Sequence, residues 1–326
     1  MKHISILVPE TAVLAAVGDP RYMFTAVNQF LASAGKAPLF TVELIGQSRD
    51  VYLNEGLFSV HVDKLMSEVK QTDLIFIPAL SGELGAALDK NRDWIPWIVQ
   101  HYKSGAELAS LCIGAFLLAS TGLLNGKQCS THWLFANEFR RRFPEVDLVD
   151  GGIITEEQGI YSSGGASSYW NLLLYLVEKY TDRATAIQAA KFFAIDIDRS
   201  SQSAFVMFQG QKEHDDEEVK AAQEFIERNY PDKIAVEQLA SRFAIGRRSF
   251  ERRFKKATNN TVVEYIQRVK IEAAKRCFET TRKNISEVMF DVGYTDTKAF
   301  RDVFKKITGL TPLEYRNKYN KPVAQA

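Results

Sequence analysis

The chain has few cysteines, almost no net charge and no long apolar run. Its three cysteines, Cys112, Cys129 and Cys277, are too few for a disulfide framework, so we expect a cytoplasmic protein in a reducing setting. No Cys and His spacing fits a zinc site, and we expect neither a metal nor another cofactor. No apolar run reaches the roughly 20 residues that cross a membrane, so we expect no membrane contact. The first ten residues resemble a strand and a turn rather than a signal peptide.

The net charge of +1 hides a large difference between the two parts of the chain. Residues 1–217 hold 18 Lys and Arg against 26 Asp and Glu, whereas residues 218–326 hold 23 against 14. A basic part next to an acidic part predicts that only the basic part meets a polyanion such as DNA. The length also favours two domains. We place them at residues 1–195 and 219–326, joined by a linker over residues 196–218 whose second half is polar and charged.

The basic part carries one helix-turn-helix pattern twice, over residues 236–258 and 285–308. In each copy a short helix and a turn with glycine precede a second helix that is aromatic on one face and charged on the other. At an offset of 50 residues the copies share these identities: Phe250 and Phe300, Phe254 and Phe304, Lys255 and Lys305, Lys256 and Lys306, Thr258 and Thr308, Tyr265 and Tyr315. A repeat at a fixed period predicts one all-α unit used twice, with second helices suited to the major groove.

The acidic part alternates apolar strands with helices. We expect strands at residues 4–8, 40–45, 74–78, 106–111, 146–149 and 159–162. We expect helices at residues 21–34, 94–102, 113–120, 167–180 and 184–194. This alternation predicts a doubly wound, flavodoxin-like α/β domain, in which ligands bind beyond the carboxyl ends of the strands.

One strand end carries a reactive type of residue, Cys112, in the sequence Ser110-Leu-Cys-Ile-Gly114. Small residues two positions to each side are typical of a nucleophile elbow, where a sharp turn brings the backbone close to neighbouring strands. At the start of the next helix the thiol would have a lowered pKa. Cysteine is as often a small buried apolar residue, so a packed thiol stays open as an alternative.

Four other residues are candidates for the rim of this site. His132 would act as a base or contact a ligand, although its aromatic neighbour Trp133 equally favours a structural role. Glu10 follows the first strand and would reach the same rim. The turn at Gly164 and Gly165 precedes a helix, so its backbone N–H groups would bind an anion.

The segment over residues 219–319 resembles the DNA-binding domain of the AraC family of transcription regulators. The matching stretches are residues 239–240, 248–256, 292–296, 300–306 and 309–316. Residues 111–124 and 131–133 resemble the amidotransferase-like superfamily that includes the PfpI-like intracellular cysteine proteases. The combination is similar to regulators in which such a domain senses a signal rather than catalyses a reaction, and it implies a homodimer by analogy.

The resemblance also assigns roles to exposed residues of the two second helices. Base contacts are implied for Arg248, Glu251, Arg252, Thr297, Lys298 and Arg301. Phosphate contacts are expected for Lys255, Lys256, Lys305 and Lys306. A rigid helix over residues 261–280 would place the two second helices in successive major grooves, about 34 Å apart.

Two positions depart from the family patterns. Active members of the protease superfamily carry histidine directly after the cysteine, where this chain has Ile113. Asp302 stands where arginine is common, and it would accept from a cytosine amino group or orient Arg301. We therefore predict a transcription regulator that senses a small molecule or a redox signal and is not an enzyme. The alternative is a cysteine hydrolase or amidase fused to a DNA-binding domain.

Overall fold

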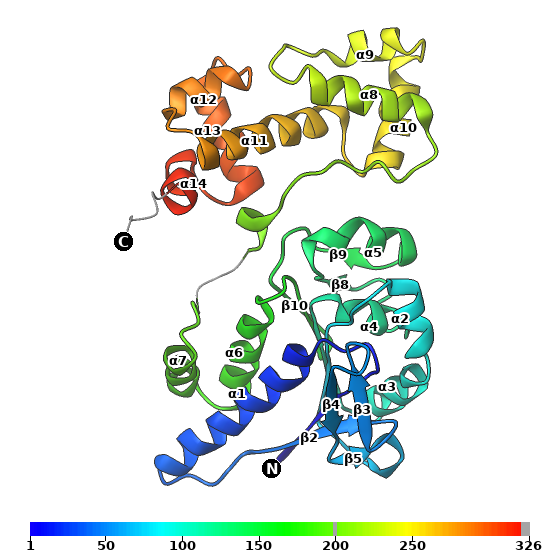
Figure 1. Ribbon diagram of the computed structural model, residues 1–326, viewed down its shortest axis with the longest axis vertical. Helices are drawn as coiled ribbons and strands as arrows, with labels where there is room; N and C mark the ends of the chain where they lie inside the picture. The colour runs from blue at the N-terminus through cyan, green and yellow to red at the C-terminus, as the bar shows by residue number, and fades with distance from the viewer. Residues whose placement is uncertain (198–200, 321–326) are drawn as a thin grey trace. The chain divides into compact units, whose positions relative to one another are not determined.

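The protein divides into two compact units, Met1–Gln202 and Ser203–Ala326, in a computed structural model that describes residues 1–197 and 201–320 (Figure 1). The division falls inside the linker expected over residues 196–218. Gln202 is buried in the first unit, whereas Phe208 packs edge-on against Tyr265 of the second unit, with ring centroids 5.1 Å apart. Much of the expected linker is therefore attached to one unit or the other.

The first unit is built on a seven-stranded sheet with the order β10-β11-β7-β6-β1-β2-β5. The strands are β1 Lys2–Leu7, β2 Phe40–Gly46, β5 Lys64–Leu65, β6 Leu74–Ile77, β7 Glu107–Leu111, β10 Ile154–Glu157 and β11 Ile160–Ser163. All neighbours pair in parallel except β10 and β11. Because the chain runs outward from β1 in both directions, the sheet is doubly wound, and the predicted fold class is confirmed.

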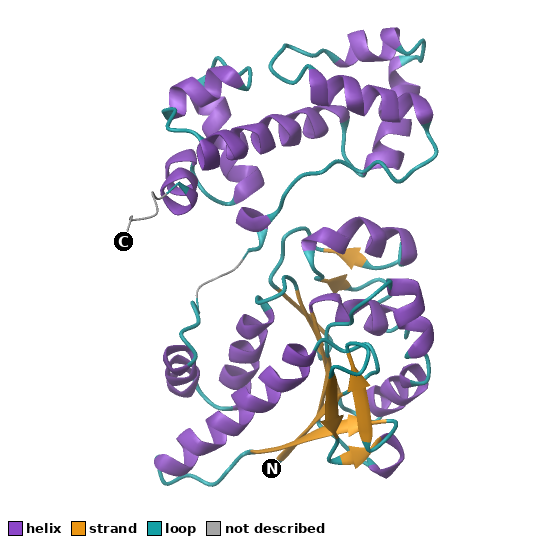
Figure 2. Cartoon of the chain, viewed as in Figure 1, coloured by secondary structure: helices purple, strands orange, loops and turns teal. Residues whose placement is uncertain are grey.

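Helices cover both faces of the sheet (Figure 2). Those on one face are α1 Leu14–Ser33, α6 Tyr169–Tyr180 and α7 Arg183–Phe192. Those on the other are α2 Leu84–Lys90, α3 Trp94–Lys103, α4 Ala115–Ala119 and α5 Ala136–Arg142. Each face buries its own apolar cluster, because the parallel strands present apolar side chains to both sides.

Several elements of the first unit differ from the sequence-based expectation. Helix α1 begins at Leu14 rather than at residue 21, because Ala16 and Val17 are buried against the sheet and their packing outweighs the presence of Pro20. The antiparallel hairpin β3 Asp50–Leu53 and β4 Phe58–His61 was not expected, and neither was the short pair β8 Gln128–Cys129 and β9 Asp147–Leu148 as a separate parallel sheet. Strands β5 and β10 and helices α2 and α5 are also additional. Most of these elements are too short to show a clear periodicity of apolar residues.

The second unit consists of helices around two apolar clusters. They are α8 Glu217–Arg228, α9 Val236–Arg242, α10 Arg247–Thr258, α11 Val262–Thr280, α12 Ile285–Asp291, α13 Thr297–Thr308 and α14 Pro312–Tyr319. The first cluster centres on Phe250 and Phe254, and the second on Phe300 and Phe304. Helix α11 contributes to both, and its 19 residues span about 28 Å.

The repeat seen in the sequence is also a repeat of hydrogen bonds. Thr258 and Thr308 each donate their hydroxyl to the carbonyl oxygen four residues earlier, at 2.8 Å in both copies. Helices α10 and α13 then end in left-handed residues, Asn259 with φ 55° and Gly309 with φ 75°. The two expected helix-turn-helix motifs are therefore confirmed as equivalent structures.

Candidate functional site

Each second helix buries its aromatic face and exposes its basic face. Phe250 and Phe254 of α10 are fully buried, as are Phe300 and Phe304 of α13. Five of the six expected base-contact residues are exposed, namely Arg248, Arg252, Thr297, Lys298 and Arg301. The sixth, Glu251, is half-buried. The expected phosphate-contact residues Lys255, Lys256, Lys305 and Lys306 are all exposed. Both helices therefore have the amphipathic build that a groove-binding helix needs.

Ion pairs occupy some of the charges on α10. Arg247 binds Glu237 of α9, and its Nε lies 3.3 Å from Glu251 Oε1, so Glu251 already has a cationic neighbour. Arg253 pairs with Asp216 at 2.6 Å and with Glu218 at 2.7 Å. Because Asp216 also caps helix α8, Arg253 joins α8 to α10.

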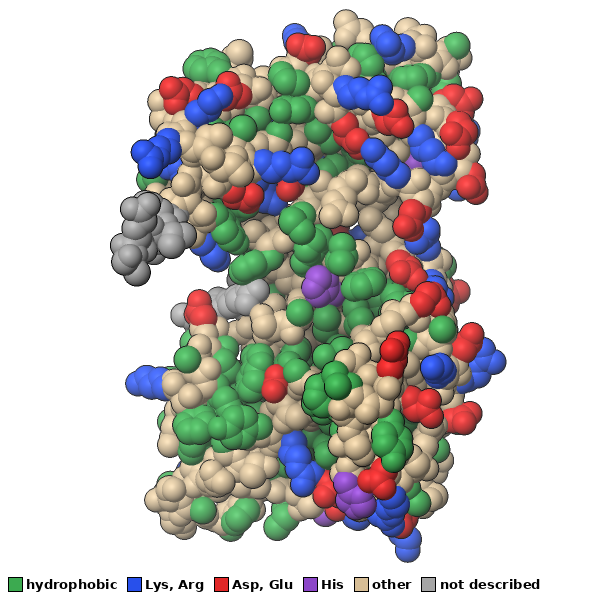
Figure 3. Space-filling model, in the orientation of Figure 1, with side chains coloured by type: hydrophobic (Ala, Val, Ile, Leu, Met, Phe, Trp, Pro, Cys, Tyr) green, Lys and Arg blue, Asp and Glu red, His purple; other side chains and the backbone are tan. Residues whose placement is uncertain are grey.

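The basic side chains do not gather into one patch on the visible face. Figure 3 shows Lys and Arg spread over the helical unit with acidic side chains between them. On α13, Asp302 is exposed beside Arg301, and within the described ranges no hydrogen bond joins the two. The expectation that Asp302 orients Arg301 therefore has no support in the unbound helix, and its reading of a cytosine stays a prediction.

The elbow predicted around Cys112 is present at the carboxyl end of β7. Cys112 has φ +56°, a left-handed conformation that is strained for a residue with a side chain. A Cβ on Gly114 would lie 2.5 Å from the carbonyl oxygens of Ile77 and Pro78, so only glycine fits two residues after the cysteine. Ser110, two residues before it, is fully buried. The small residues therefore allow the elbow backbone to approach the neighbouring strand closely, as their spacing predicts.

The thiol itself is packed rather than activated. The Cys112 side chain is only 5% exposed, and burial raises its pKa to about 12, which the Ile113 N–H only partly opposes. The expectation of a lowered pKa at a helix start is therefore wrong. Cys112 is the first residue of a three-residue 3-10 turn, Cys112–Gly114, and desolvation outweighs the small dipole of so short an element.

Two groups near Cys112 were not found from the sequence. Tyr169 donates its hydroxyl to Asp19 at 2.6 Å, joining residues 150 positions apart. Burial raises the pKa of Tyr169, and the adjacent Asp19 and Cys112 add to this rise. Burial also raises the pKa of Asp19, although Tyr169 and Trp170 oppose this by hydrogen bonding. Neither residue lies in a recognisable motif, so only the packing of α1 against α6 reveals the pair.

His132 and Glu10 do not act on Cys112 in this structure. The His132 Nδ1 accepts the Leu134 N–H at 3.1 Å and so caps a short helical turn, and burial lowers the pKa of His132. The Glu10 side chain is exposed, and its backbone N–H donates to Asn91 at 3.1 Å. Within residues 1–197 and 201–320, no hydrogen bond connects either side chain to Cys112.

The turn at Gly164 and Gly165 is already occupied. The Gly164 N–H donates to the Ile153 carbonyl at 3.0 Å. It is therefore not available to an anion, contrary to the sequence-based expectation. A Cβ on Gly164 would lie 1.7 Å from Gln202 Nε2, which means that the Gln202 side chain fills the space above the turn. Gln202 is a residue that the sequence did not single out.

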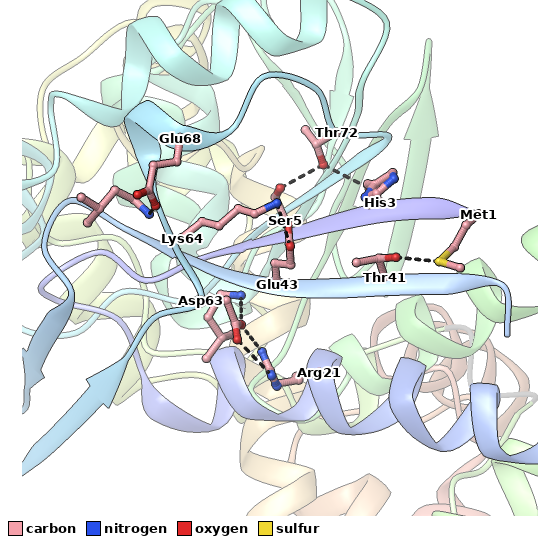
Figure 4. A network of polar contacts seen from close by, with 12 residues as sticks. Met1, His3, Ser5, Arg21, Thr41, Glu43, Asp63, Lys64, Glu68 and Thr72 are labelled. Atoms are coloured by element: carbon pink, nitrogen blue, oxygen red, sulfur yellow. Dashed lines mark hydrogen bonds and ion pairs between the residues drawn. The ribbon is translucent and has the colours of Figure 1, made fainter.

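A separate polar cluster lies along the β1, β2 and β5 edge of the sheet (Figure 4). Ser5 donates to the Thr72 hydroxyl at 3.0 Å, and Asp63 binds Arg21 and the Leu44 N–H. Partial burial opposes ionisation, but the hydrogen bonds from Arg21 and Leu44 lower the pKa of Asp63 below its usual value. These bonds hold the edge strand in place and have a structural role.

Alkylation kinetics test the packed state of Cys112. With a pKa of about 12, only on the order of one Cys112 thiol in ten thousand is ionised at pH 8. We expect iodoacetamide to modify the half-buried Cys277 well before Cys112. We also expect the Cys112 rate to rise about tenfold per pH unit from pH 8 to 10. Peptide mapping by mass spectrometry measures both, and labelling of Cys112 as fast as Cys277 at pH 7 would contradict the packed thiol.

Comparison with known families matches both units. Residues 239–318 match a helix-turn-helix domain model, and residues 24–179 match the DJ-1/PfpI family. Three transcriptional regulators of Pseudomonas aeruginosa are similar along most of the chain. GbdR is 22% identical, covering 82% of this chain and 72% of the relative. ArgR is 24% identical (73% and 70%), and CdhR is 22% identical (88% and 84%).

Solved structures support the fold of the first unit. A transcriptional regulator protein from Vibrio parahaemolyticus superimposes with a TM-score of 0.53 at 21% identity, covering 59% of this chain and 98% of the other. A ThiJ/PfpI family protein from Pseudomonas syringae gives 0.51 at 16% identity, covering 63% and 79%. Among the described residues, no helix has the length and apolar character to cross a membrane.

Proposed function

We propose that the chain is an AraC-type regulator, which regulates transcription by binding specific DNA sequences under the control of its first unit. The matches to a helix-turn-helix domain and to the DJ-1/PfpI family support this proposal. The observation that carries this proposal is the pair of equivalent helices α10 and α13 on one shared helix, α11. Two exposed basic faces at a fixed separation are suited to reading two adjacent major-groove segments.

The two faces divide into reading and positioning residues. Arg248, Arg252 and Arg301 carry guanidinium groups that can bind guanine through two hydrogen bonds. Lys255, Lys256, Lys305 and Lys306 lie in the last turns of α10 and α13, and we assign them to phosphates.

We propose that the first unit senses a signal and does not catalyse a reaction. A cysteine hydrolase or amidase needs a thiolate near neutral pH and a base beside it. Burial raises the pKa of Cys112 to about 12, and the His132 Nδ1 is engaged in capping. Both observations favour sensing over the enzymatic alternative. A cytoplasmic homodimer joined through the first unit agrees with this role, and we propose it by analogy with two-fold regulators.

Selection of bound sequences from random duplex DNA tests the proposed function. The purified full-length chain should enrich one sequence family with two half-sites about one helical turn apart. A chain that is folded by circular dichroism and enriches no sequence at physiological salt contradicts the proposal. Repeating the selection with the phosphate-contact variant below separates base reading from simple charge attraction.

Lys305→Ala tests the phosphate assignment. Removing one phosphate contact should weaken binding to selected and unrelated duplexes by the same factor, because phosphates carry no sequence information. The slope of log K against log salt concentration should become shallower by about 0.9. Filter binding at several salt concentrations measures both quantities. A loss confined to the selected sequence would move Lys305 to the base-reading set.

A further inference from the structure

The side chain of Gln202 is held inside the first unit at the point where the chain leaves it. Gln202 is 2% exposed, and its Nε2 donates to the Gly152 carbonyl at 2.7 Å and to the Thr131 carbonyl at 3.2 Å. Its backbone N–H donates to the Gly151 carbonyl at 2.8 Å. The next residue, Ser203, begins the helical unit. The last residue of the first unit is therefore anchored by its own carboxamide.

Two glycines beside this carboxamide leave room for it because they have no side chain. A Cβ on Gly164 would lie 1.7 Å from Gln202 Nε2, and one on Gly165 would lie 3.2 Å from Gln202 Oε1. We call the surrounding residues the Gln202 seat. It comprises Ser130, Thr131, Gly152, Gly164, Gly165 and Ser168. The seat adjoins the elbow, because the Thr131 hydroxyl donates to the Cys112 carbonyl at 3.2 Å.

Gln202 does not satisfy the polar groups of its seat. Four buried side-chain polar atoms lack a hydrogen-bond partner in the described ranges, and three of them are Gln202 Oε1, Ser130 Oγ and Ser168 Oγ. Ser168 Oγ would lie 2.5 Å from a Cβ on Gly165, and Ser130 Oγ 2.9 Å from one on Gly152. Unpartnered buried groups are costly and rare in folded proteins. Their concentration here indicates a site whose hydrogen-bonding capacity Gln202 uses only in part.

We propose that the Gln202 seat is a ligand site for a small molecule with a planar amide or amidine group, and that Gln202 is its tethered occupant when the ligand is absent. The ligand donates N–H groups to the Thr131 and Gly152 carbonyls, as Gln202 does now. It also engages the hydroxyls of Ser130 and Ser168, which Gln202 leaves unpaired. Displacing Gln202 loosens the chain where it enters the helical unit, which links ligand binding to the DNA-binding part. This inference rests on the sensing role proposed above.

Gln202→Ala in the full-length chain empties the seat, and acetamide is the probe. A ligand that must first displace a tethered group binds with an apparent Kd equal to its intrinsic Kd divided by the fraction of sites that are open. We therefore expect Q202A to bind acetamide at least tenfold more tightly than the unmodified chain, followed by the NMR shifts of the Gly164 and Gly165 amides. Acetate, which has no N–H groups, should shift neither amide. Gln209→Ala is the matched control, because Gln209 is exposed in the same segment.

Equal acetamide binding by folded Q202A and Q209A overturns the proposal. If Q202A does not fold, hydrogen exchange of the Gln202 amide in the unmodified chain decides instead. Molar acetamide should accelerate this exchange and molar acetate should not, and unchanged exchange rejects the seat. Selection from random DNA with the same preparations separates the two proposals. If the chain selects a DNA sequence but fails both acetamide tests, only the ligand site is rejected. If it passes the acetamide tests but selects no DNA sequence, the DNA-binding role is rejected.

Discussion

Replacing Phe304 by alanine is expected to destabilise the second helix-turn-helix by about 3–5 kcal/mol. The Phe304 ring is fully buried and packs against Phe278, Phe300 and Tyr315, with centroid distances of 5.5 to 5.8 Å. Alanine would leave a cavity at the centre of one apolar cluster, and the basic face of α13 would lose its support. Loss of specific DNA binding should accompany the loss of stability.

The chain allows the two units to be followed separately in one unfolding experiment. All four tryptophans, Trp94, Trp97, Trp133 and Trp170, lie in the first unit. Urea unfolding of F304A should therefore show an early loss of helical circular dichroism and an unchanged tryptophan fluorescence transition. Phe290→Ala is the matched control, since Phe290 of α12 is 61% exposed and should cost no more than about 0.5 kcal/mol. An equal shift in F304A and F290A would mean that the second cluster does not hold α13.

Arg252→Ala is expected to weaken binding to the selected DNA by about 1–3 kcal/mol, which is roughly a five- to 150-fold change in Kd. Arg252 is exposed on α10, one turn before Lys256, and within the described residues no ion pair occupies its guanidinium. The neighbouring Arg253 is committed to Asp216 and Glu218, so the two adjacent arginines have different roles. The preference for one base at the contacted position should be lost as well.

Arg252→Lys separates charge from geometry at the same position. Lysine keeps the positive charge but lacks the planar fork that binds guanine through two hydrogen bonds. We expect R252K to keep the affinity for unrelated duplexes and the salt dependence of the unmodified chain, while losing most of the preference at one base pair. Competition binding with single-base variants of the selected site measures this. A uniform loss on every duplex would assign Arg252 to a phosphate.

The helical unit was the more predictable part because its signals are local. The i, i+4 aromatic pairs at Phe250 and Phe300 define the buried face of each second helix without reference to distant residues. Capping residues mark the helix starts in the same local way. Thr311 and Glu314 cap α14 reciprocally, as the sequence spacing of a capping box requires.

The α/β unit was less predictable at its edges and at its candidate site. The long apolar strands β1, β6 and β7 are evident from composition alone, whereas the hairpin β3 and β4 depends on pairing between short segments that have no distinctive period. Burial of the Cys112 thiol could not be predicted from the sequence either. The elbow sequence predicts the turn at Cys112, but whether water reaches the sulfur depends on helices α1 and α6, which come from distant parts of the chain.

By itself, the sequence determined the two-unit organisation, the doubly wound sheet, the duplicated helix-turn-helix and the glycine two residues after Cys112. These were predicted from periodicity, charge and a short elbow motif, which are all read from residues close together in the chain. Only the tertiary structure decided that Cys112 is packed, that Asp19 meets Tyr169 and that Gln202 fills the space above Gly164. The reason is that desolvation and hydrogen-bond satisfaction depend on what surrounds a group in space, and the side-chain hydrogen-bond partners of Asp19 and Gln202 lie 50 to 150 residues away.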